Sequence, residues 1–197
     1  MKTLVTWIGW LCLTGLAFAA PADGISAGDR AQDFTLTDVR TGKAVTLSDY
    51  KESRAVVVVF IGTQCPYSNA FNHVMADLST KYQPKGVVFL GINANKTEPL
   101  EQVKSHAEQK GLDFTVLKDN GSEVADRFGA MVTPEAFLID PADWSVRYHG
   151  ALGNSHQPTT KASATNGEEL SAALDAFLAG QPVAHPTTKM FGCSIKR

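Results

Sequence analysis

The sequence predicts an α/β fold, with a central mixed sheet flanked by helices and an additional β-hairpin near its N-terminus. Two apolar runs rich in β-branched residues, at 55–61 and 87–92, are typical of strands buried on both faces. A helical pattern follows each run, and two further strands and a helix close the domain. Alternating strands and helices that end in a strand pair indicate a sheet that is parallel in part.

The first half of the fold begins with a hairpin over 33–47, in which apolar residues alternate on both sides of a turn at 40–43. After the first buried run, the segment from Gly62 to Cys65 ends the strand, and Pro66 starts a helix. The apolar positions of this helix fall on one face and are Phe71, Val74, Met75, Leu78 and Tyr82.

The second half alternates shorter elements. They are a helix over 100–110, a strand over 114–117, a helix over 122–128 and two strands over 136–139 and 145–148. A polar loop over 150–165 leads to the last helix, which Asn166 can cap and Gly180 ends. The remaining residues, 181–197, are expected to form a tail that lies across the domain.

Residues 1–19 have the three-part pattern of a secretory signal peptide. Lys2 is followed by an apolar stretch and then by Ala17-Phe18-Ala19, which suits a cleavage site. The apolar stretch is shorter than a membrane span requires, although an uncleaved anchor is the alternative. We therefore expect an exported protein, periplasmic or secreted, with its main domain at 20–180 and its tail at 181–197.

The composition excludes several other classes of protein. The 18 basic residues nearly balance the 20 acidic ones and form no cluster, which argues against a nucleic-acid partner. A hydrophobic content of 44% is that of a folded domain. We expect no stable membrane span after removal of the signal peptide, and no cofactor.

Removal of the signal peptide takes Cys12 with it and leaves Cys65 and Cys193. A single pair is too few for a fold built on disulfides, so the two thiols need another explanation. Cys65 ends a strand and immediately precedes Pro66, where helix N–H groups and the helix dipole favour an anion. The thiolate is the nucleophilic form of cysteine, so this position predicts a reactive residue. A buried structural cysteine is the alternative.

A second motif, Val132-Thr133-Pro134, stands just before the strand at 136–139. Together with Cys65, its order and spacing resemble the thioredoxin superfamily. Segments 27–36 and 45–50 look like the opening hairpin of the redoxins, which include alkyl hydroperoxide reductase/thiol-specific antioxidant proteins and exported thiol-disulfide oxidoreductases. The C-terminal run from Gly192 to Lys196 is similar to the tail of a redoxin subgroup with a Cys-Pro-Tyr site. The resemblance implies a thioredoxin fold, a cis bond at Pro134 and a Thr133 backbone that pairs with substrate.

The sequence also departs from these families. Ser68 replaces the second cysteine of the dithiol thioredoxins, so the site has one thiol in its helix. Gly62 replaces the threonine of typical peroxiredoxins, so high peroxidase activity is not expected. Ser68 is a candidate donor of a hydrogen bond to the thiolate, and we expect Glu135 to lie either beside the site or at the surface. The predicted substrate contacts are Thr63, Pro66, Tyr67, Ser68, Thr133 and Pro134.

Cys65 is therefore the predicted catalytic nucleophile, for thiol-disulfide exchange or peroxide reduction. Cys193 is a resolving thiol, half of a permanent bridge, or a contact for another protein; the first is favoured, which makes it the second predicted catalytic residue. The expected partners are a thiol or disulfide protein, or a hydroperoxide, and a reducing thiol partner.

Two alternative functions stay open. Thr63-Gln64-Cys65-Pro66 also resembles the Sco-type copper chaperones, although Asn69 stands where these have a second cysteine. A Cu(I) site here needs Cys193 and one histidine as further ligands, and the candidates are His149, His156 and His185. The other alternative is a redoxin fold that has lost its chemistry and serves as a scaffold for a partner protein.

Overall fold

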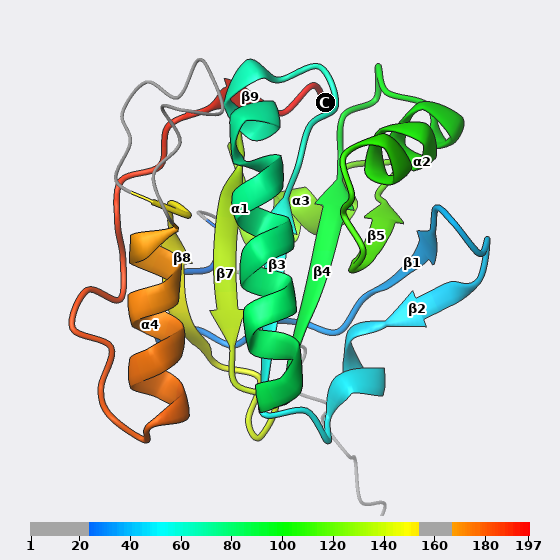
Figure 1. Cartoon of the computed structure of the whole chain (residues 1–197). Coiled ribbons are helices and arrows are strands. Elements are labelled where there is room, and N and C mark those ends of the chain that lie inside the picture. Colours follow the sequence, from blue (N-terminus) through cyan, green and yellow to red (C-terminus); the bar gives the residue numbers. More distant parts are fainter. Residues whose placement is uncertain (1–23, 154–166) are drawn as a thin grey trace, which may run out of the picture.

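The computed structural model describes residues 24–153 and 167–197, and its centre is a seven-stranded mixed sheet (Figure 1). The strand order is β2-β1-β5-β4-β3-β7-β8. Strands β3, β4 and β5 run parallel to one another, and every other neighbouring pair is antiparallel. The bounds are β1 Thr35–Asp38, β2 Ala44–Thr46, β3 Ala55–Phe60, β4 Val87–Asn93, β5 Thr115–Lys118, β7 Glu135–Ile139 and β8 Val146–Gly150.

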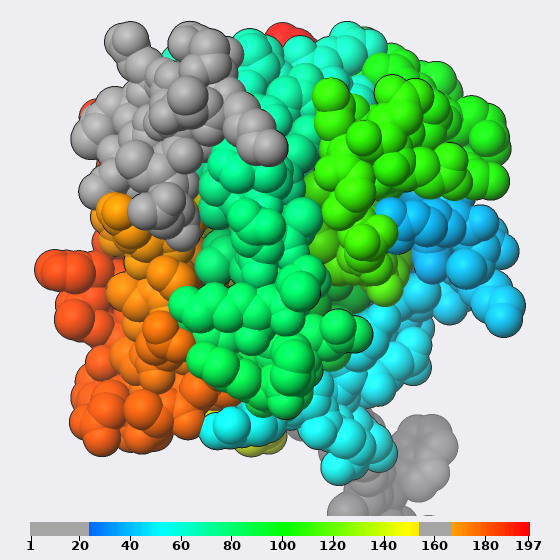
Figure 2. Space-filling model, in the orientation of Figure 1, coloured from blue at the N-terminus to red at the C-terminus, as the bar shows by residue number. Residues whose placement is uncertain are grey.

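Four α-helices within the described residues cover the two faces of this sheet. Helices α1 (Pro66–Tyr82), α2 (Leu100–Gln109) and α4 (Glu168–Leu178) lie on one face, and α3 (Glu123–Phe128) lies on the other (Figure 1). Figure 2 shows α4, α1 and α2 next to one another across the first face. The predicted architecture, a mixed sheet with helices on both sides and an N-terminal hairpin, is confirmed.

Strand β3 is buried on both faces, as its run of valines predicts. Val57 points to the side of α1 and packs in one apolar cluster with Met75. Phe60 points to the side of α3, where its ring centroid lies 5.7 Å from that of Phe128. Full burial of such side chains stabilises the fold by roughly 2–3 kcal/mol each. Because β3 and β4 pair in parallel, their carboxyl ends lie at the same edge of the sheet.

The N-terminal hairpin extends the sheet beyond β5. Strand β1 pairs with β2 on one side and antiparallel with β5 on the other. The guanidinium of Arg40, in the turn between the two strands, donates hydrogen bonds to the carbonyls of Leu112 and Phe114. The turn is thus joined to the segment that enters β5.

The predicted elements agree with the observed ones to within two residues at each end. Not predicted are two short 3-10 helices, η1 (Leu47–Tyr50) and η2 (Gln83–Lys85), and two short strands described below. The N-cap of α4 is Gly167 at φ 65°, one residue after the predicted Asn166, which lies outside the described residues. Glycine suits this place because a Cβ there would lie 2.7 Å from Val74 and Leu78 of α1.

The C-terminal tail follows the sheet edge and then crosses to the carboxyl ends of the strands. The N–H of His149 in β8 donates to the Pro186 carbonyl, and Thr188 N–H donates back to His149. Farther on, β9 (Cys193–Ser194) pairs antiparallel with β6 (Val132–Thr133) in a separate two-stranded sheet. In Figure 1, β9 and the C-terminus lie close to the N-terminal end of α1.

The predicted signal peptide at 1–19 lies outside the described residues, as does most of the loop at 150–165. No helix in 24–153 or 167–197 has the length and apolar character that a bilayer crossing needs.

Candidate active site at Cys65 and Cys193

Cys65 occupies the junction between β3 and α1 that the sequence predicts. It is the N-cap residue of α1 in extended conformation, and Pro66 takes the first helical position. The backbone N–H of Ser68 donates to the Cys65 Sγ at 3.4 Å. One N–H group of the first helical turn, that of Ser68, thus faces the sulfur at the positive end of the helix dipole, an arrangement that stabilises negative charge there.

The loop before β7 forms the opposite wall of the site. The Thr133–Pro134 peptide bond is cis, as the resemblance implies. The carbonyl oxygen of Thr133 lies 3.1 Å from the Cys65 Sγ and accepts a hydrogen bond when this cysteine is a thiol. Thr133 is buried, so its backbone and the Cys65 sulfur face each other inside the protein.

Cys193 reaches the same point from the far end of the chain. Both cysteines are free thiols, and their Sγ atoms are 2.6 Å apart. The pairing of β9 with β6 brings this about, because Cys193 is the register partner of Thr133. The sulfurs are close enough for a disulfide bond of about 2.05 Å to form with little movement of the backbone.

Gly192 allows this close approach of the tail. A Cβ at this position would lie 2.7 Å from the carbonyl carbon of Thr133 and closer still to the carbonyl oxygen. Because both atoms belong to backbone, a side chain could fit only if the tail moved away. Glycine is therefore required where the tail passes the cis bond.

The two sulfurs differ in their electrostatic surroundings. Burial, together with a hydrogen bond and Coulomb interaction with Cys65, raises the pKa of Cys193 to about 11. The backbone N–H of Tyr67 and the charge of Lys196 act in the opposite direction. Cys193 is therefore protonated near neutral pH and a weak nucleophile in this state. Cys65 is the candidate nucleophile because of its position at the N-terminus of α1.

The predicted substrate contacts lie around Cys65, although they differ in exposure. Pro66 is exposed and Tyr67 is partly exposed. Thr63 is buried, and its hydroxyl accepts a hydrogen bond from Gln102 at 2.7 Å. Ser68 is fully buried.

The bond expected from the Ser68 side chain to sulfur comes from its backbone instead. The Ser68 hydroxyl accepts a hydrogen bond from the Gly62 N–H at 3.1 Å, because the loop turns back over the first turn of α1. Gly62 has little room for a side chain, since a Cβ would lie 2.9 Å from the Thr133 hydroxyl. A threonine at this position, as in typical peroxiredoxins, would therefore require the Thr133 side chain to move.

Glu98 is a residue of the site that the sequence analysis missed. Its carboxylate is 2% exposed and accepts hydrogen bonds from the backbone N–H groups of Thr63 and Gln64, at 2.8 and 3.0 Å. Asn93 Nδ2 donates to it as well. Burial raises the pKa of Glu98, but the hydrogen bonds from Thr63, Asn93, Gln64 and Asn95 outweigh burial and hold it below its ordinary value. A buried carboxylate therefore fixes the loop that leads to Cys65.

Glu135 is also inside the protein rather than at the surface. It is fully buried directly after the cis bond, and its carboxylate accepts the N–H groups of Met131 and Val132 at 2.9 and 3.1 Å. His149 Nε2 lies 2.7 Å from the other carboxylate oxygen. The pair supports the loop on which the tail rests.

The histidines that the structure describes do not gather around the two thiols. His149 is bound to Glu135, and His185 is exposed on the tail. Nowhere in residues 24–153 and 167–197 do three His, Cys, Asp or Glu side chains form a group able to hold a metal ion. The third copper-ligand candidate, His156, lies outside these ranges.

Comparison with known proteins agrees with this geometry. Residues 27–149, more than half of the chain, match the AhpC/TSA family. A thiol-disulfide oxidoreductase ResA from Bacillus thuringiensis (strain Al Hakam) is 33% identical over 123 residues, which cover 62% of this chain and 69% of the relative. Among such ResA relatives, the matched share of their own length is as low as 63%.

Solved structures match over more of the chain. A conserved protein of uncharacterized function from Geobacillus kaustophilus has a TM-score of 0.80 at 36% identity, covering 91% of this chain and 94% of its own. A hypothetical protein from Sinorhizobium meliloti 1021 has a TM-score of 0.79 at 34% identity, covering 88% and 95%. With a family match over the domain, relatives above 30% identity and a thioredoxin-fold site, this chain belongs to the AhpC/TSA family of thiol-based oxidoreductases.

Proposed function

We propose that this protein catalyses thiol-disulfide exchange through Cys65, with Cys193 as its resolving thiol. The Cys65 thiolate attacks one sulfur of a substrate disulfide, which forms a mixed disulfide and releases the first substrate thiolate. Cys193 then attacks the Cys65 sulfur, which releases the second substrate thiolate and leaves a Cys65–Cys193 disulfide. The substrate disulfide is reduced by two electrons, and the two cysteines are oxidised. The separation of 2.6 Å between the two sulfurs is the observation that carries this proposal.

The electrostatics of the pair support the order of these steps. While Cys65 is free, its interaction with Cys193 helps to keep the latter protonated and unreactive. Once Cys65 is part of a mixed disulfide, this contribution disappears and Cys193 loses its proton more readily. The second thiol is therefore activated by the first step, in the sequence that resolution requires.

The exposure of the sulfurs indicates how substrate and reductant enter. Cys65 is 4% exposed while the tail is in place, whereas Cys193 is partly exposed. We propose that substrate reaches Cys65 when the tail moves aside, with Pro66, Tyr67 and the Thr133–Pro134 loop as contacts. A reducing thiol then attacks the more accessible Cys193 sulfur, which releases the Cys65 thiolate and leaves a mixed disulfide at Cys193. A second thiol attacks this mixed disulfide and releases reduced Cys193, which regenerates the enzyme.

Disulfides fit the site better than hydroperoxides. Gly62 stands where the resemblance implies a threonine that positions peroxide. The neighbouring Thr63 already has partners, because its backbone N–H donates to Glu98 and its hydroxyl accepts a hydrogen bond from Gln102. The matched relatives carry the name thiol-disulfide oxidoreductase. The activity must therefore be measured with both a disulfide and a hydroperoxide as substrate, so that the two reactions can be compared.

We place the activity outside the cytoplasm, on the basis of residues 1–19. Their pattern directs export, and an oxidising compartment supplies disulfides as substrates. Cell fractionation and the N-terminal mass of the exported protein test this; a mature chain that still begins at Met1 contradicts it.

The test of function compares the wild type with Cys65→Ser and Cys193→Ser. Reduction of a model disulfide and of a hydroperoxide is measured for each, and tryptic mass mapping locates any disulfide. Loss of activity in Cys65→Ser, a trapped mixed disulfide in Cys193→Ser and a Cys65–Cys193 disulfide in the wild type are expected. Normal turnover by Cys193→Ser contradicts the role of Cys193, and faster reduction of peroxide than of disulfide contradicts the substrate class.

A further inference from the structure

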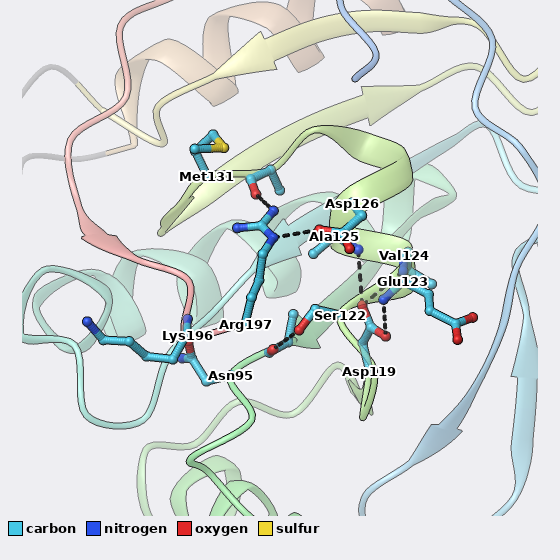
Figure 3. A network of polar contacts seen from close by, with 12 residues as sticks. Asn95, Asp119, Ser122, Glu123, Val124, Ala125, Asp126, Met131, Lys196 and Arg197 are labelled. Carbon is cyan, nitrogen blue, oxygen red and sulfur yellow. Dashed lines mark hydrogen bonds and ion pairs between the residues drawn. The ribbon is translucent and has the colours of Figure 1, made fainter. Parts of the chain in front are cut away.

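The last six residues of the chain are held in place on both sides of Cys193. Ile195 is buried, and its N–H donates to the Met131 carbonyl at 3.0 Å. At the end of the chain, the Arg197 guanidinium contacts the Asp126 carboxylate at 2.5 Å and the Ala130 carbonyl at 2.6 Å (Figure 3). The tail is thus bound along the segment from Met131 to Thr133 and to α3.

Asn95 holds this tail from the opposite side. It lies just beyond β4, is 4% exposed, and its side-chain oxygen accepts the backbone N–H of Lys196 at 2.7 Å (Figure 3). The neighbouring Lys96 N–H donates to the Lys196 carbonyl at 2.8 Å. The N–H and the carbonyl of Lys196 are therefore both hydrogen-bonded, to Asn95 and Lys96 respectively.

The same asparagine belongs to the buried network behind Cys65. Its side chain hydrogen-bonds to Glu98, whose carboxylate holds the backbone of the Cys65 loop. The buried Lys118 ammonium donates to the Asn95 carbonyl at 2.7 Å and to Asn93 Oδ1 at 2.8 Å. One side chain therefore touches the support of Cys65 and the backbone of the tail that carries Cys193.

We propose that Asn95 is a positioning residue for disulfide formation, which ties the Cys65 loop and the C-terminal tail to one buried anchor. This rests on the proposed function, since it concerns the step in which Cys193 attacks Cys65. A tail held at Lys196 keeps Cys193 beside its target, and a well-oriented pair reacts as if at high local concentration. Without Asn95 the tail keeps its other contacts but moves more freely.

The test measures the effective concentration of Cys193 at Cys65, from the equilibrium of the full chain with reduced and oxidised glutathione. Asn95→Ala loses a buried hydrogen-bond partner on both sides, and we expect the effective concentration to fall about tenfold. Arg197→Ala, which loosens the tail at its other end, is expected to lower it by a smaller factor. Arg147→Ala is the matched control, because the ion pairs of this arginine are with Asp140 and Asp143 and not with the last six residues, so the glutathione equilibrium should not change.

The readout separates positioning from stability. A purely structural role of Asn95 weakens the reduced and oxidised forms equally, so that unfolding midpoints fall while the glutathione equilibrium stays at the wild-type value; this result overturns the inference. If Asn95→Ala does not fold, the Arg197→Ala equilibrium decides, and a wild-type value overturns it as well. A wild type that forms no Cys65–Cys193 disulfide in any glutathione buffer contradicts the proposed function itself.

Discussion

Cys65 and Cys193 meet at one point of the molecule but are held there in different ways. Cys65 lies between a buried strand and a 17-residue helix, with the Glu98 carboxylate fixing the loop before it. Cys193 lies in a two-residue strand, and its segment is held by backbone contacts to Thr133 and Met131 and by the Asn95 side chain. The proposed nucleophile is thus built into the core, whereas the proposed resolving thiol lies on a C-terminal tail that, in our proposal, moves aside for the substrate.

This difference suits the two proposed roles. A nucleophile needs a fixed orientation against the helix N-terminus, because the stabilisation of its charge depends on the position of a few N–H groups. A resolving thiol must leave while substrate occupies the site and return afterwards. Changes near Glu98 should therefore act mainly on stability, and changes in the tail mainly on the second chemical step.

The largest effect is expected for Glu98→Gln. The amide cannot accept the hydrogen bonds that both carboxylate oxygens now accept, so the variant should lose about 3 kcal/mol of unfolding free energy at pH 7. Because its folded pKa is below the ordinary 4.5, the contribution of Glu98 is present above about that pH and is lost as the pH falls through the folded value. Urea unfolding at pH 7 and pH 4 measures both.

The comparison for Glu98→Gln is Glu52→Gln, an exposed glutamate in the segment before β3. This control should stay within about 0.5 kcal/mol of the wild type. An equal loss for Glu98→Gln and Glu52→Gln would show that the carboxylate does not support the Cys65 loop.

Gly192→Ala is expected to act on the tail alone. Its methyl group collides with the Thr133 backbone, so the tail must shift and Cys193 loses its alignment with Cys65. Resolution of a preformed mixed disulfide at Cys65 should slow by about 10–100-fold, as stopped-flow release of a chromogenic thiol would show. Ser194→Ala, at an exposed neighbouring position, is the control and should resolve at the wild-type rate. If Gly192→Ala resolves equally fast, the close approach of the tail has no part in the reaction.

The sequence predicts the surroundings of Cys65 better than those of Cys193. The run of valines in β3, the apolar face of α1 and the Cys65-Pro66 junction are local patterns, and they predict the sheet, the helix and the place of the nucleophile. The Thr133–Pro134 loop follows from resemblance. Strand periodicity and capping rules depend on residues close together in the sequence, so they predict these local elements but not contacts between distant segments.

The meeting of Cys65 with Cys193 is not local. The two residues are 128 positions apart, and their contact depends on the path of a tail with no hydrophobic period and one two-residue strand. The sequence therefore left three interpretations of Cys193 open.

Asn95 and Glu98 were missed because polar residues after a strand are usually exposed. Only the adjacency of β3 and β4 in the sheet places them beside the Cys65 loop. The polar run from Asn93 to Glu98, directly after a buried strand, was the available signal.

A smaller effect is expected on the reactivity of Cys193 when its partner is removed. In Cys65→Ser the charge that helps to raise the pKa of Cys193 is absent, although burial still acts. Alkylation of Cys193 by iodoacetamide at pH 8 should become roughly tenfold faster than in the wild type, as a shift of one pKa unit gives. Mass mapping of initial rates between pH 7 and 10 distinguishes the two thiols. Superimposable pH profiles for Cys193 in both proteins would mean that Cys65 does not suppress its ionisation.

The smallest effect is expected for Thr63→Val, which tests whether the loop contacts substrate or only supports the site. The change removes the hydroxyl that accepts the Gln102 hydrogen bond and keeps the shape of the side chain, so the unfolding free energy should fall by about 1 kcal/mol. The backbone N–H of Thr63, bound to Glu98, is unaffected, and disulfide reduction should stay within about threefold of the wild type. A double-mutant cycle with Gln102→Ala should show that the two losses are not additive, because both remove the same bond. A drop in activity of more than tenfold with unchanged stability would instead make Thr63 a direct substrate contact, and the loop would then share with the tail the task of binding the reactants.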